Sequence, residues 1–78
     1  MEIRETGLLL AKIALLDNRT ATNETIMAWH EILQDIPFED AMLALLIHYR
    51  TSTDWVRPAH IVQGALAIRK ERKKKIIE

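Results

Sequence analysis

The chain has no cysteine, only two glycines and only two prolines. Without cysteine it forms no disulfide and no thiolate zinc site. Its glycines, Gly7 and Gly64, lie far apart, and no segment sustains the alternation of apolar and polar residues that predicts a strand. A chain of 78 residues buries only about 60–65% of its unfolded surface. Its stability must therefore come from helix packing, from self-association or from a partner protein.

Long apolar runs are also absent. The run from Leu8 to Leu16 is too short to cross a bilayer and is interrupted by Lys12. No N-terminal stretch combines a basic start, an apolar core and a cleavage site of small residues. We therefore expect a cytoplasmic protein that has no membrane partner.

The formal net charge is zero because two halves of opposite sign cancel. Residues 1–49 hold three basic and eight acidic residues, net −5, and residues 50–78 hold eight basic and three acidic residues, net +5. An apolar, mildly acidic body with a basic C-terminal helix is typical of an adaptor that grips an anionic molecule or docks a protein partner.

Apolar residues recur at helical spacing in the first half of the chain. They predict a first helix from Ile3 to Leu16, followed by a polar joint. A second helix begins after an N-cap at Thr22 or Asn23. Pro37 stops this helix and starts the next one. The residues expected on the apolar stripes of the first two helices are Leu9, Ile13, Leu16, Ile26, Trp29, Leu33 and Ile36.

The second half of the chain predicts two more helices. The segment from Ala41 to Ile47 is apolar all round, so we expect neighbouring helices to cover it at the centre of the fold. The last helix opens at Arg57-Pro58, and its basic end is a solvated extension that is free to fray. The expected fold is therefore all-α: a compact, single four-helix domain with a core over about residues 3–68 and a basic tail over residues 69–78.

The polar residues give little support to catalysis or metal binding. His30 begins like a zinc-protease helix motif, but Gln34 stands where the second histidine should be. His48, Asp54 and His60 could converge across a loop, yet each has a simpler role at a helix end or on the surface. A body this small also leaves little room for a nucleophile with its base and orienting acid. We expect no metal, no cofactor and no enzymatic activity.

The two tryptophans lie in different surroundings. Trp29 lies on an apolar stripe and is expected in the core. Trp55 lies in a polar loop near Arg50, Arg57 and His60, a composition that can stack a base while neutralising phosphates. The alternative is that Trp55 packs back as a staple that holds the loop against the next helix.

Six basic residues lie between positions 69 and 75. They either favour the helix end and keep the domain in solution, or contact an anionic partner such as nucleic acid. The residues expected to form the partner or nucleic-acid binding surface are Arg50, Trp55, Arg57, Arg69, Lys70, Arg72 and Lys73, with Lys74 and Lys75 adding long-range attraction.

Four short segments occur in a recognisable order: Trp29-His30-Glu31-Ile32-Leu33, Asp35-Ile36-Pro37-Phe38-Glu39-Asp40-Ala41, His48-Tyr49-Arg50 and Pro58-Ala59-His60-Ile61. In this order they resemble the small phage helicase loader/inhibitor family, over roughly residues 8–66. The resemblance implies an all-helical domain that binds the replicative helicase of the host or phage. His60 stands where that family commonly has an acidic residue. The start of the last helix is therefore less negative and better suited to binding phosphate.

Three functions follow as hypotheses. The leading one is a non-enzymatic phage or prophage DNA-replication accessory protein that binds the replicative helicase and modulates its loading. The alternative is a small DNA-binding regulator with a helix-turn-helix-like unit, although the turn from Thr51 to Val56 is longer than usual for that motif and the preceding helix is very apolar. A third is a host-takeover protein that blocks an unrelated target with an apolar helix face.

Overall fold

The computed structural model describes the backbone of residues 1–77 and the side chains of residues 1–73. The elements in chain order are α1 (Ile3–Asp17), α2 (Asn23–Leu33), α3 (Phe38–Thr51) and α4 (Pro58–Ile77). No strand occurs among residues 1–77, and the all-α prediction is confirmed. Within the same range, no helix is both long enough and apolar enough to cross a membrane.

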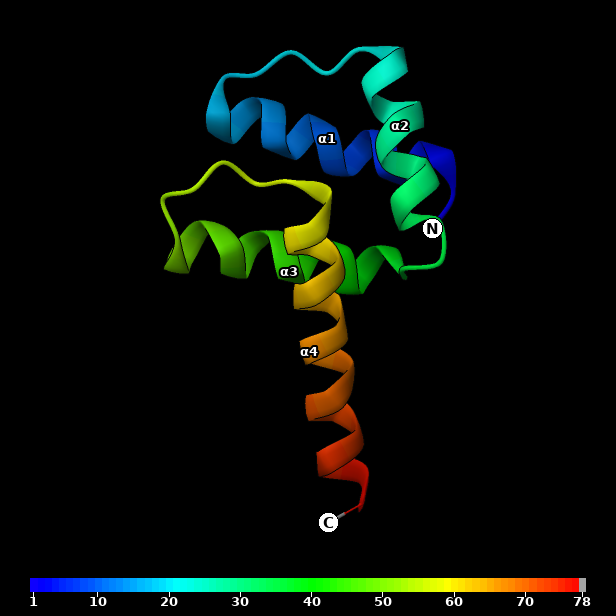
Figure 1. Cartoon of the computed structure of the whole chain (residues 1–78), viewed down its shortest axis with the longest axis vertical. Coiled ribbons are helices and arrows are strands. Elements are labelled where there is room, and N and C mark those ends of the chain that lie inside the picture. Colours follow the sequence, from blue (N-terminus) through cyan, green and yellow to red (C-terminus); the bar gives the residue numbers. More distant parts are fainter. Residues whose placement is uncertain (78) are drawn as a thin grey trace.

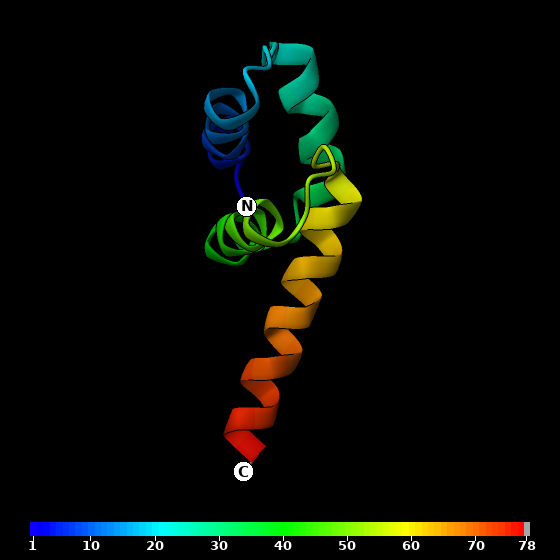
Figure 2. The same ribbon diagram turned by 90° about the vertical axis from the view of Figure 1, so that its left-hand side faces the viewer.

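The four helices form two crossed layers (Figures 1 and 2). Helices α1 and α3 lie side by side in one layer, and α2 and α4 run across them in the other. Between the layers α1 contacts α2 and α3 contacts α4, and within the layers α1 contacts α3 and α2 contacts α4. The most extensive contact joins α3 and α4. Beyond this contact, α4 continues out of the body and gives the molecule its length of 43 Å.

The core lies where the two layers cross. Leu9 and Ile13 of α1 are buried, as the stripe predicts, but Leu16 is half-exposed. The prediction for Leu16 is wrong because the last turn of α1 runs beyond its crossing with α2 (Figure 1). Trp29 is partly buried against the core, in agreement with the prediction. The buried core residues are Leu9, Leu10, Ile13, Leu33, Ile36, Ala41, Leu45, Val56, Ile61 and Ala65.

Local chemistry sets the helix ends close to where the sequence predicts them. The Thr22 hydroxyl accepts a hydrogen bond of 3.2 Å from the Thr25 N–H, which identifies Thr22 as the N-cap of α2. Pro58 is the first residue of α4, where its missing N–H costs nothing. Helix α2 ends at Leu33, before the predicted stripe does, and Ile36 reaches the core from a turn. The restricted backbone of a residue preceding proline explains this early end.

One prediction about the later helices needs correction. Within the described part of the chain, α3 is packed by α1 and α4 alone, so one side of this apolar helix stays open: Leu43, Leu46 and Ile47 are 43%, 42% and 44% exposed. The basic segment belongs to the last helix, as the sequence predicts, because α4 continues to Ile77. Cations near the C-terminal end of a helix interact favourably with its dipole, which supports this continuation.

Candidate partner-binding surfaces

The loop between α3 and α4 spans residues 52–57 and carries the first group of predicted site residues. Val56 is fully buried and anchors the loop in the core, whereas the adjacent Trp55 is 62% exposed. The anchoring role that the staple interpretation gives to Trp55 therefore belongs to Val56. The side chains of Arg50 and Arg57, which flank the loop, are exposed.

Arg19, from the joint between α1 and α2, holds this loop in place. One guanidinium nitrogen donates hydrogen bonds to the Asp17 carboxylate at 3.0 Å and to the Val56 carbonyl at 3.2 Å. The guanidinium carbon also lies 4.6 Å from the ring centroid of Trp55, a cation–π arrangement. The indole therefore has a guanidinium against its ring while remaining largely exposed to solvent.

Tyr49 of α3 completes this network. Its hydroxyl donates a hydrogen bond of 2.5 Å to the same Asp17 oxygen that accepts from Arg19. Burial and the hydrogen bond to Asp17 raise the pKa of Tyr49, and the nearby Arg19 opposes this shift. The network joins α1, α3 and the loop, so it holds in place the part of the loop that carries the exposed Trp55.

The histidines near the loop do converge, in a form that suits structure better than metal binding. The rings of His48 and His60 lie 4.5 Å apart, centroid to centroid, at an interplanar angle of 33°. The His48 Nε2 is 2.8 Å from the backbone oxygen of Asp54, and the Arg57 N–H donates to His60 Nδ1 at 2.8 Å. Asp54 thus contributes a carbonyl rather than a carboxylate. Residues 1–73 contain no group of three or more potential metal ligands of the His, Asp and Glu types.

The second group of predicted residues lies on the projecting half of α4. Arg69, Lys70 and Lys73 follow the half-exposed Leu66 on the same face of α4 and, together with it, line a hollow of about 290 Å³. We call these four residues the basic face. Position 69 lies twelve residues along the helix from Arg57, or about 18 Å, so the predicted residues fall on two separate surfaces rather than one. The side chains of Lys74 and Lys75 lie outside the described residues.

Arg72 differs from its basic neighbours because it is bound within the protein. Its guanidinium donates to the Asp40 carboxylate at 2.5 Å, and Asp40 lies in the first turn of α3. The side chain of Asp40 is 3% exposed and that of Arg72 is 55% exposed. Arg72 thus compensates a buried charge and ties the start of the projecting segment to the body. It remains open to solvent on its other side.

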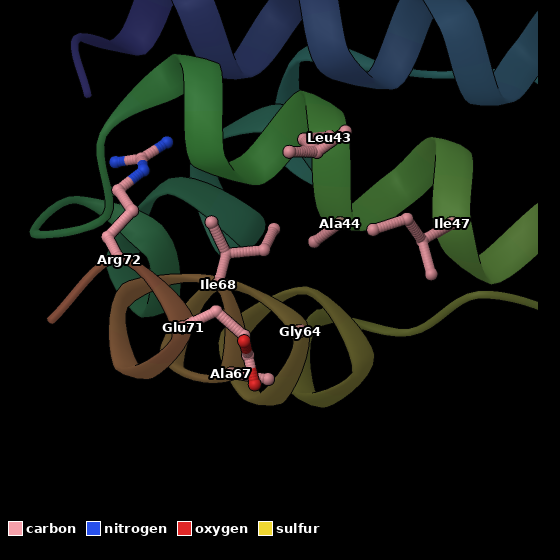
Figure 3. Close-up of a pocket in the computed structure, with 8 residues that line it drawn as sticks. All are labelled: Leu43, Ala44, Ile47, Gly64, Ala67, Ile68, Glu71 and Arg72. Carbon is pink, nitrogen blue, oxygen red and sulfur yellow. The ribbon is translucent and has the colours of Figure 1, made fainter. Parts of the chain in front are cut away.

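An apolar groove runs between α3 and α4, beside this ion pair (Figure 3). Its volume is about 450 Å³. Ala44 and Gly64 face each other closely in the groove, because a Cβ atom at position 64 would lie 2.7 Å from the Cβ of Ala44. The sequence prediction missed this groove because it expected neighbouring helices to cover most of α3. The lining residues are Leu43, Ala44, Ile47, Gly64, Ala67, Ile68, Glu71 and Arg72.

Comparison with known proteins adds no family assignment: no protein-family profile, no curated protein and no solved structure matches the chain.

Proposed function

We propose that the protein is a non-enzymatic DNA-replication accessory protein of phage or prophage origin, which binds a replicative helicase and modulates its loading on DNA. The order of the sequence segments and their resemblance to the small phage helicase loader/inhibitor family support the choice of helicase. The basic face supports a role in contact, because it presents three cations next to the half-exposed Leu66.

The mechanism we propose is docking by α4. Leu66 supplies a small apolar contact, and Arg69, Lys70 and Lys73 select a partner segment that carries carboxylates. Because the α3–α4 contact and the Asp40–Arg72 ion pair fix the helix to the body, docking would orient the whole body relative to the helicase. The loop with Trp55 and Arg57 would then make a second contact about 18 Å away along the direction of the helix.

The geometry favours this proposal over the DNA-binding alternative. A helix-turn-helix unit presents the N-terminal residues of its second helix to base edges. Here the early residues of α4 pack inward: Ile61 and Ala65 are buried, and the helix contacts both α2 and α3. Arg57 is exposed just before the helix begins, but the exposed cations of α4 itself, from Arg69 onward, lie in its C-terminal half.

Co-elution on a sizing column with a bacterial replicative helicase, at low and at moderate salt, tests the proposal. The charge reversal Arg69→Glu with Lys73→Glu should abolish the complex, because it inverts the sign of the basic face. The matched control is Arg4→Glu with Lys12→Glu on the exposed surface of α1, which makes the same change of charge and should leave the complex intact.

Three outcomes oppose the proposal. If no complex forms at either salt concentration, the helicase is not the partner. If duplex DNA binds in the same runs and this binding weakens with salt, the DNA-binding alternative is favoured. A complex that both double variants weaken equally would show attraction by net charge rather than docking on the basic face. A complex that neither variant weakens would place the contact elsewhere.

A further inference from the structure

The open side of α3 carries an ordered stripe. Glu39, Leu43, Leu46, Ile47 and Arg50 are all exposed, and their spacing of i, i+4, i+7, i+8 and i+11 places them on one face of the helix. We call these residues the α3 stripe. Its centre is aliphatic, its N-terminal end is acidic and its C-terminal end is basic.

The α3 stripe is complementary to itself when a second copy is laid on it in the opposite direction. In an antiparallel pairing centred on the middle of the stripe, Glu39 of one copy faces Arg50 of the other, and Leu43 faces Leu46. Both pairs fit the same alignment, because the two residue numbers add up to 89 in each pair. Each contact occurs twice, as a two-fold axis requires. The helix dipoles are also antiparallel, which places each positive end beside a negative one.

The groove beside the stripe offers further apolar surface. Leu43 and Ile47 belong to both features, since they line the groove on the α3 side while Ala67 and Ile68 line it on the α4 side (Figure 3). A helix laid along the α3 stripe would cover these two side chains and close one side of the groove. Leaving them in water forgoes about 0.8 kcal/mol for each CH₂ group that burial would remove from solvent.

From this arrangement we propose that the protein forms a symmetric dimer in which the α3 stripes of two copies pack antiparallel. The charges favour a second copy as the occupant. When the stripe of one copy is reversed against that of another, each acidic end faces a basic end and the aliphatic centres face each other. Each copy contributes five side chains, fewer than the roughly 20–30 residues that each side of a standard stable interface contributes. We therefore expect a weak dimer.

Sedimentation equilibrium over a wide range of protein concentration, with charge-reversed variants, tests the dimer. Glu39→Arg places two guanidinium groups against each other at both contacts of the dimer, and Arg50→Glu places two carboxylates together in the same way. Each variant alone should raise the dissociation constant by about tenfold or more. An equimolar mixture should recover the affinity of the parent protein, because the heterodimer relieves the like-charge contacts that each variant makes with itself.

The mixing result separates this pairing from a change in folding, since each chain keeps its own monomer stability in the mixture. Glu24→Arg is the matched control, because Glu24 is also an exposed acid in the first turn of a helix, and it should leave the dissociation constant unchanged. Thermal unfolding followed by circular dichroism should show that all variants remain helical.

Several results would overturn the proposed dimer. A monomer at every concentration would leave the α3 stripe to a different protein. A concentration-dependent series of larger species would indicate a head-to-tail contact that does not close. A dimer that tolerates both single reversals, or single-variant dimers that do not exchange into a heterodimer on mixing, would place the interface on another surface.

Discussion

The close approach of α3 and α4 depends on the missing side chain at Gly64. A Cβ atom at this position would lie 2.7 Å from the Cβ and 3.5 Å from the Cα of Ala44. Carbon atoms in contact normally lie about 3.5–4.0 Å apart. Ala44 has no rotatable side chain that could move away, so the substitution Gly64→Ala must push the two helix backbones apart by about 1 Å, the difference between these distances.

The expected loss follows from two opposing effects. Replacing glycine by alanine inside a helix stabilises the helix by about 1 kcal/mol. Forcing extra volume into a packed contact costs about 1–3 kcal/mol. Gly64→Ala should therefore lower the free energy of unfolding by up to about 2 kcal/mol. Gly7→Ala is the matched control, because its Cβ would meet only the Cδ1 of Ile26, at an ordinary 3.8 Å. It should raise the free energy of unfolding by about 1 kcal/mol.

Urea unfolding followed by circular dichroism, at one fixed protein concentration, measures both variants. A double-mutant cycle tests the contact directly, because Ala44→Gly removes the Cβ atom with which the new Cβ of Gly64→Ala would clash. Ala44→Gly should destabilise the parent by about 1 kcal/mol and should cost less, or even stabilise, when Ala is present at position 64. The reasoning is refuted if Gly64→Ala stabilises as much as Gly7→Ala, or if Ala44→Gly costs the same in both backgrounds.

Three further predictions concern the buried polar groups and the loop. Arg72→Ala should lower the free energy of unfolding by about 1–3 kcal/mol, because it leaves the buried Asp40 carboxylate without its partner; urea unfolding measures this, and Asp40→Asn in the same chain should recover part of the loss. Burial and its acidic hydrogen-bond partner raise the pKa of Tyr49, so its phenolate absorbance should appear at higher pH in the folded than in the unfolded protein. The resulting stabilisation is complete below the unfolded pKa of about 10 and is lost as the pH rises through the folded pKa; an equal titration in urea would contradict this. Val56→Ala should lower the free energy of unfolding by about 1.5–3 kcal/mol, which thermal unfolding would show as a lower midpoint. Trp55→Ala should lower it by less than about 1 kcal/mol. A larger loss for Trp55→Ala than for Val56→Ala would make Trp55 the anchor of the loop.

The starts of α2 and α4 can be predicted from the sequence because they depend on neighbouring residues. Thr22 caps α2 through a hydrogen bond to a residue three positions later, and Pro58 fits the first turn of α4 without any distant contact. The helical stripes are predictable for the same reason. Their exposure is not, because it depends on where the crossing helices stop. Leu16 and the open side of α3 both show this dependence.

The division of the predicted site also depends on distant contacts. In the sequence, Arg72 is one basic residue among several, and only the fold brings it to Asp40, which is 32 positions away. Arg19 lies 37 positions from the Val56 carbonyl that it binds, and no local pattern marks it as part of the loop. Which cations remain available to a partner therefore becomes clear only from the fold.

The crossing of α3 and α4 has a consequence for the order of folding. These helices follow each other in the chain and share the largest contact, so they can pair after closing only a short loop. Helical folds that are rich in such local contacts fold in about microseconds to milliseconds. We expect the α3–α4 pair to form first and to provide the surface on which α1 and α2 assemble. Substitutions at Gly64 should then slow folding, whereas those in α1 should mainly speed unfolding.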